Sequence, residues 1–330
     1  MNSKNIKKHL NAKLNDWLAN IEDDNIKKIL KENVIITGGA LVSLLTGEKV
    51  HDYDVYLRTN EACKAVAEYY VQQWNKAHGE EGQIYLKVIP SETIQVPTYE
   101  NGERKLDENG QPATHPVVTP ERIKVFVPSA GVVEEEKPVD TEVDAPFPPI
   151  EEVEQTDEDK AAEEASEEKD KPKYRPVFMS SNAITLSDKI QIVTRFYGEV
   201  EVIHKNYDFA HCTCSWTYWN NEVQLPEKAL ECIINKELYY IGSKYPLCSI
   251  IRTRKYLERG YHINAGQYVK MAFQLNELNL YDLETLEDQL TGVDSGYFAM
   301  MIEALRKKAN ESGEAVVDKS YVFELINRMF

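Results

Sequence analysis

The chain has 330 residues, of which 42% are hydrophobic and 28% charged, and its formal net charge is −17. This length and apolar content suit one large core or two ordinary ones, while the acidic balance disfavours a surface that binds nucleic acid throughout. The sequence has no run of about 20 apolar residues and no apolar core after its charged N-terminus, so we expect a cytoplasmic protein without a membrane helix.

The five cysteines are an odd number, which argues against a disulfide framework. His211, Cys212 and Cys214 suggest half of a zinc site, but no second pair of ligands follows at a matching spacing. We therefore expect reduced thiols, with Cys212 and Cys214 on one buried face of a strand.

At the N-terminus, apolar residues recur at intervals of three and four, which predicts a helix within residues 5–30. A short β-type run, Val34 to Thr37, follows and ends in two glycines. A helix-like stretch then leads into a second strand-like run, HDYDVYL. The order strand, glycine turn, helix and strand is therefore predicted over residues 34–57.

This segment carries the chemistry that the sequence predicts. Gly38 and Gly39 allow a sharp turn from strand to helix, and the helix N-terminus can then hold a triphosphate. Asp52 and Asp54, two residues apart on a strand, face the same way and can bind Mg²⁺ or Mn²⁺ for in-line displacement at an α-phosphate. The alternative is a glycine N-cap followed by a solvated edge strand.

An acidic insert is predicted within residues 99–174. Residues 134–173 hold 17 acidic and five basic residues, a local charge of −12 that leaves −5 for the rest of the chain. Their low apolar content predicts a largely disordered, solvated loop, because too little surface can be buried to offset the chain entropy. A hairpin or loop is expected at 100–115 and one strand at RIKVFVP.

After the insert, AITL, KIQIVTRF and FAHCTCSW have the composition of short strands, and helical periodicity begins at Pro226. The predicted fold class is α+β, with a mixed sheet and a helical tail. Its parts are an N-terminal helical segment at 1–32, a head at 33–98 and 175–220, the insert at 99–174 and a helical neck and tail at 221–330.

The run GGALVSLLTGEKVHDYD resembles the head signature of the poly(A) polymerase and CCA-adding tRNA nucleotidyltransferase family, GGxxxxxLLGxxxxDxD. The interval from Gly38 to Asp52 matches without a gap. Thr46 departs where a second leucine is expected, and Val42 and Ser43 stand where the family has Arg-Asp. The resemblance implies that the two glycines contact the triphosphate and that both aspartates bind metal.

Two later segments show fainter similarity. NYDFAHCTCSW resembles the family's RRDFTINAMAY segment, where Lys205 is the base nearest to the missing paired arginines. YPLCSIIRTRKYLERGY resembles the neck helix, with Arg254 in step. The resemblance therefore implies nucleotide-binding roles for Lys205 and Arg254.

A third carboxylate is expected as general base or further metal ligand. The family's place for it falls at Gln191, which cannot ionise. Asp208, between Tyr207 and Phe209, is the preferred replacement, and Glu201, in the run Val-Glu-Val, is the second. A structural role for Asp208 stays open.

The sequence thus predicts transfer of a nucleoside monophosphate from an NTP to an acceptor hydroxyl, which the resemblance implies is an RNA 3′ end. Two alternatives remain: a catalytically inactive binding or structural protein, and a toxin-type enzyme that nucleotidylates a protein. The preferred nucleotide, the acceptor and the oligomeric state are not determined by the sequence.

Overall fold

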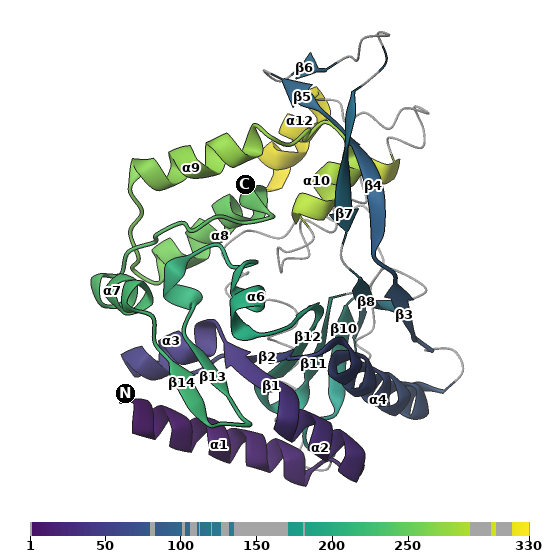
Figure 1. Cartoon of the computed structure of the whole chain (residues 1–330), viewed down its shortest axis with the longest axis vertical. Coiled ribbons are helices and arrows are strands. Elements are labelled where there is room, and N and C mark those ends of the chain that lie inside the picture. The colour runs from purple at the N-terminus through teal and green to yellow at the C-terminus, as the bar shows by residue number, and fades with distance from the viewer. Residues whose placement is uncertain are drawn as a thin grey trace. The chain divides into compact units, whose positions relative to one another are not determined.

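The computed structural model (Figure 1) forms two compact units. One comprises Met1–Glu92, Pro120–Lys137 and Glu158–Tyr239, and the other Thr93–Thr119, Pro138–Asp157 and Tyr240–Phe330. The structure describes residues 2–79, 83–100, 103–105, 111, 113–119, 121–126, 132–134, 171–180, 182–290, 305–307 and 319–329. The predicted insert spans residues 99–174, and its acidic part at 135–170 lies outside the described residues.

The first unit is built on an eight-stranded sheet. In spatial order its strands are β14 (Glu222–Gln224), β13 (Ser215–Thr217), β1 (Val34–Thr37), β2 (Tyr53–Leu57), β12 (Ile190–Tyr197), β11 (Ala183–Leu186), β10 (Pro176–Ser180) and β9 (Val132–Glu134). Strands β2 and β12 are parallel, and the other neighbouring pairs are antiparallel. The predicted α+β class with a mixed sheet is confirmed.

The single N-terminal helix predicted from the sequence is two helices, α1 (Ser3–Ala19) and α2 (Asp24–Asn33). The chain breaks between them because Asp23 caps α2, accepting hydrogen bonds from the backbone N–H groups of Asn25 and Ile26. Apolar periodicity continues across this break, so periodicity alone did not reveal it.

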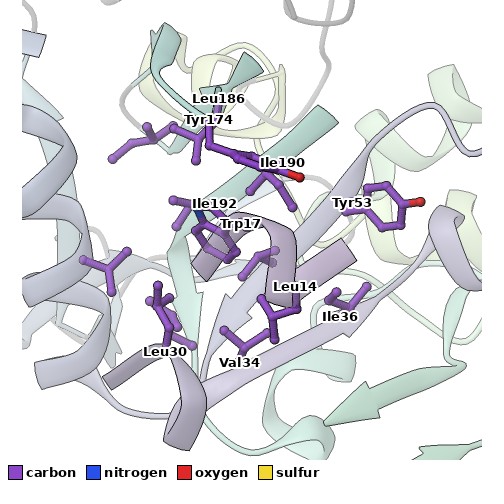
Figure 2. Packing of buried hydrophobic residues seen from close by; sticks show 14 of the residues in the cluster. Leu14, Trp17, Leu30, Val34, Ile36, Tyr53, Tyr174, Leu186, Ile190 and Ile192 are labelled. Carbon is purple, nitrogen blue, oxygen red and sulfur yellow. The ribbon is translucent and has the colours of Figure 1, made fainter. Parts of the chain in front are cut away.

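One face of the sheet carries the main core, beneath α1, α2 and α4 (Asn60–His78). Figure 2 shows Leu14 and Trp17 of α1 and Leu30 of α2 packed near Val34 and Ile36 of β1. All five side chains are fully buried. Because side chains alternate along a strand, every second residue of β1 and β2 belongs to this core, as do Ile190 and Ile192 of β12.

The opposite face carries a small cluster whose buried members are Ile35, Tyr56, Val200 and Ile203. The last two come from α6 (Val200–His204), which Figure 1 shows across the sheet from α1 and α2. Val200 and Ile203, three apart, bury one face of this helical turn against the sheet.

The described part of the predicted insert contains more strands than the one expected at RIKVFVP. That strand is β8 (Arg122–Phe126), which pairs with β3 (Tyr85–Ile89) and buries Ile123 and Val125 in the main core. The expected hairpin is present as β5 (Tyr99–Glu100) and β6 (Glu103–Arg104). Strands β4 (Glu92–Pro97) and β7 (Thr114–Thr119) form a further pair.

The predicted helical tail is confirmed within the described residues. Its helices are α7 (Glu227–Asn235), α8 (Pro246–Glu258), α9 (Ala265–Leu275), α10 (Leu283–Leu290) and α12 (Lys319–Met329). No helix in the described part of the chain is long and apolar enough to cross a membrane.

The segment FAHCTCSW is only partly a strand. Residues Ala210–Cys212 form a short 3₁₀ helix, η3, and pairing with β1 begins at Ser215. All five cysteines are free, as the sequence predicted, and all are buried. Cys212 lies in η3 and Cys214 in the loop before β13, so the prediction that both lie on one face of a strand is wrong.

Replacing Leu14 by Ala should lower the free energy of unfolding by about 2–5 kcal/mol, because a cavity would open under α1. Ile234→Ala, at a residue that is 79% exposed in the same unit, should change it by less than about 0.5 kcal/mol. Urea unfolding monitored by circular dichroism measures both. Equal effects of the two substitutions would contradict the described packing of α1.

Candidate active site

The predicted order of strand, glycine turn, helix and strand is confirmed: β1 ends at Thr37, α3 spans Gly39–Thr46, and β2 follows. Gly38 has φ 85° and ψ −143°, a conformation that essentially only glycine adopts. Its N–H donates to the carbonyl of Cys212 over 3.2 Å. The Gly38 N–H therefore already has a hydrogen-bond partner within the chain.

The two glycines have different surroundings. A Cβ built on Gly38 would lie 3.3 Å from Asp54 Oδ2 and 3.4 Å from the Tyr207 hydroxyl. A Cβ built on Gly39 would meet nothing within 4 Å. Gly38 thus allows the backbone to lie close to a carboxylate, whereas Gly39 borders open space at the start of a helix.

Asp54 lies on the face of the sheet opposite the main core, because its neighbours Tyr53 and Val55 point into that core. Asp52 precedes β2 by one residue. Both aspartates are partly exposed. The Asp54 carboxylate thus lies beside the glycine turn, and Asp52 lies two residues before it.

Gln191 is the register partner of Asp54 across the parallel pair of β2 and β12, and Thr185 is the register partner of Gln191 on β11. Paired residues on neighbouring strands project from the same face, so an amide stands beside Asp54. Among the described residues, no three His, Cys, Asp or Glu side chains gather as a metal site. In the described structure, the place beside Asp54 is held by a neutral side chain.

The structure distributes the other predicted site residues as follows. Asp208 is 4% exposed and lies between α6 and η3, directly after Tyr207. Lys205 caps the C-terminus of α6 and is exposed, as is Glu201 on the same helix. Arg254 belongs to the second compact unit, on α8, where its Nε donates to Glu258 Oε1 over 2.8 Å.

Thr37, which sequence reasoning did not select, is a centre of hydrogen bonding beside the turn. Its hydroxyl donates to the carbonyl of Cys214 over 2.8 Å and lies 2.8 Å from His204 Nε2. The hydroxyl has one hydrogen, so His204 must be the donor in the second contact. These bonds join β1 to α6 and to the loop before β13, and they fix the chain where it enters Gly38.

His204 is held in its neutral form. Burial lowers its pKa from 6.5 to about 4, although the nearby Glu201 carboxylate acts in the opposite direction. A neutral imidazole that donates from Nε2 to Thr37 is consistent with this shift. Nothing in the local sequence signals the contact, because 167 positions separate the two residues.

Tyr207 is the third residue that the sequence did not indicate. Burial raises the pKa of its hydroxyl well above the usual value, and Tyr56 and Asp54 add to the shift. The hydroxyl also makes side-chain hydrogen bonds with Tyr56 and Thr37. Tyr207 therefore connects the fixed end of β1 to the surroundings of Asp54.

Comparison with known proteins identifies the chain's relatives. A family model described as "Gabija anti-defense 2 family protein" matches residues 8–236, well over half of the chain. The protein "Gabija anti-defense 2" of Bacillus phage SPbetaL7 is 22% identical over 151 residues, which are 43% of this chain and 38% of that relative. The chain thus matches less than half the length of this relative. No solved structure matches it.

The family expected from the glycine and aspartate pattern is therefore wrong. The poly(A) polymerase and CCA-adding resemblance rested on a short segment around Gly38 and Asp52, whereas the matching family model extends over residues 8–236. A strand, a glycine turn and an acidic strand form a short local unit. Because one fold can host many functions, unrelated families can share such a unit.

Thr37→Val should lower the free energy of unfolding by about 1–3 kcal/mol, because the buried His204 donor and Cys214 carbonyl would each lose a partner. Thr194→Val is the matched control: Thr194 is fully buried on β12, and its hydroxyl has no hydrogen-bond partner within the described structure. This control should leave stability unchanged or increase it. Chemical denaturation measures the free energy of unfolding of both variants. An equal decrease in the two would disprove the role of Thr37.

His204→Gln should make stability less sensitive to acid. Because the folded-state pKa of His204 lies below its unfolded value, the unfolded chain binds the proton more readily, and stability is lost as pH falls from about 6.5 to about 4. The stability difference between wild type and variant should change by no more than about 3 kcal/mol over this window. Denaturation at several pH values measures it, with exposed His51→Gln as control; a pH-independent difference would contradict this account.

Proposed function

The chain belongs to the Gabija anti-defense 2 family, and from this premise we propose that it counteracts Gabija through a nucleotide-dependent site of nucleotidyltransferase type. Family membership supports the anti-defense role. One observation carries the chemical part: Asp54 Oδ2 lies against Gly38 at the start of α3, so that a carboxylate and a helix N-terminus share one accessible place.

The residues at this place fit a nucleotide bound with a divalent cation. Mg²⁺ is commonly held in proteins by one or two carboxylates together with substrate phosphates, and Asp52 and Asp54 supply two. Gly38 lies so close to Asp54 that a side chain on it would require the carboxylate to shift. Mg²⁺ or Mn²⁺ is therefore the proposed cofactor, held by Asp52 and Asp54.

Phosphates of an NTP would lie at the open side of Gly39, where the first turn of α3 presents N–H groups and the positive end of its dipole. Lys205, exposed at the end of α6, is the proposed additional cationic contact. Arg254, on α8 of the second unit, is a further proposed nucleotide-binding residue.

When bound, the cation would neutralise charge on the phosphates during displacement. In the proposed reaction an acceptor oxygen forms a bond to the α-phosphorus, the bond to the β-phosphate bridging oxygen breaks, and pyrophosphate leaves. Asp208 is the proposed acceptor of the hydroxyl proton, since Gln191 cannot ionise.

The acceptor has two candidate classes. An RNA 3′ end was implied by a family resemblance that the family match overturns, so it retains only the support of the general chemistry. A hydroxyl on a protein, as in toxin-type nucleotidyltransferases, agrees better with the mild negative charge of the chain outside residues 134–173. The labelling experiment below distinguishes the two.

A second candidate function is a binding protein of the same shape without catalysis. The observation that favours it is Gln191, a neutral amide at the register position beside Asp54. Such a protein would bind a nucleotide or a defense component and transfer nothing.

The anti-defense role is tested by plating a Gabija-sensitive phage on bacteria that carry Gabija, with and without this chain. We expect plaque numbers to recover when the chain is expressed. An Asp52→Ala, Asp54→Ala double variant should fail to restore them if catalysis is required. Restoration by the double variant would favour the binding protein, and no restoration by the wild type would refute the anti-defense role.

The chemistry is tested by incubating the chain with each α-³²P-labelled NTP, Mg²⁺ or Mn²⁺, and RNA or protein from Gabija-carrying cells. Label should enter one acceptor class and fall about 100-fold or more in the double variant. Asp24→Ala, at an aspartate whose side chain is 93% exposed on α2, is the matched control and should label as the wild type does. Equal labelling by all three proteins would contradict the proposed site.

A further inference from the structure

We propose that Tyr207 is a positioning residue of this site, whose hydroxyl fixes the direction in which Asp54 presents its carboxylate beside the glycine turn. The inference rests on the proposed function, because a fixed Asp54 matters only if that carboxylate binds a cation. It names a residue that neither the sequence pattern nor the relatives indicate.

Two side-chain oxygens lie close to Gly38. Asp54 Oδ2 and the Tyr207 hydroxyl both approach the place where a Cβ of this residue would stand, at 3.3 Å and 3.4 Å. Three groups from three parts of the chain therefore meet at one point: the turn after β1, the middle of β2 and the segment after α6. The Tyr207 hydroxyl thus borders the space in which the Asp54 carboxylate can turn.

Tyr207 is itself well fixed. Its backbone N–H donates to the carbonyl of His204 over 3.1 Å, and the two rings lie 5.0 Å apart. The Tyr207 ring also lies 6.3 Å from that of Tyr56, a neighbour of Asp54 on the same strand face. Its hydroxyl hydrogen-bonds with Tyr56 and Thr37. Because Tyr207 is fixed by His204 and Tyr56, it can restrain the neighbouring Asp54 side chain.

A purely structural role is the alternative, because the Tyr207 ring also packs on the small cluster of Ile35, Tyr56, Val200 and Ile203. The two roles reside in different atoms. The ring carries the packing and the hydroxyl carries the positioning, so Tyr207→Phe removes one and keeps the other.

The test measures Mn²⁺ affinity of the full chain by electron paramagnetic resonance, together with its free energy of unfolding. Tyr207→Phe should weaken Mn²⁺ binding about 10-fold or more, as loss of an outer-shell partner typically does. The matched control is Tyr218→Phe, whose hydroxyl donates to Asn15 Oδ1 over 2.9 Å at an exposed place, and it should bind as the wild type does.

The outcomes separate this inference from the proposed function. If Asp54→Ala abolishes Mn²⁺ binding while Tyr207→Phe binds as tightly as the wild type, the positioning role is wrong and the proposed metal site is supported. If the wild type binds no more Mn²⁺ than Asp54→Ala, both the metal site and the positioning role are wrong. Should Tyr207→Phe fail to fold, Tyr56→Phe, which removes a hydroxyl that holds Tyr207, must weaken Mn²⁺ binding for the inference to survive.

Discussion

The close approach of backbone to carboxylate at Gly38 is the constraint on which the candidate site depends. The positive φ makes any side chain at this position strained, and the neighbouring Asp54 oxygen would have to shift to admit one. The turn is not held by its own residues alone, since Cys212 accepts from its N–H and Thr37 bonds to both Cys214 and His204. Remote segments thus keep the turn in a conformation that the isolated peptide would rarely adopt.

Because side chains alternate along the strands, the two faces of the sheet have different side chains and different roles. One face buries a large apolar core under α1, α2 and α4, and this burial supplies most of the driving force for folding. The opposite face holds only a small apolar cluster under α6, beside a polar row that includes Thr37, Asp54 and Gln191. Because the large core on one face stabilises the fold, the other face can carry a partly exposed carboxylate such as Asp54.

The family match includes the whole of this arrangement. Residues 8–236 contain the glycine turn, the aspartates, α6 and Tyr207, whereas Arg254 lies beyond them. The family and the geometry thus point to the same unit of the molecule. They also limit the transfer of details from polymerases, because Gln191 takes the place beside Asp54 where such enzymes are expected to have an acid.

Local order was determined by the sequence alone: the mixed α+β class, the glycine turn, the helix after it and the strand that bears Asp54 all follow from patterns within about 25 residues. The helix at Val200 and the break at Asp23 escaped prediction because burial on one face and capping override periodicity. Only the tertiary structure placed Gln191 beside Asp54 and brought His204 and Tyr207 to the turn. Those contacts join residues well over 100 positions apart, and strand register and packing, which no local pattern encodes, decide them.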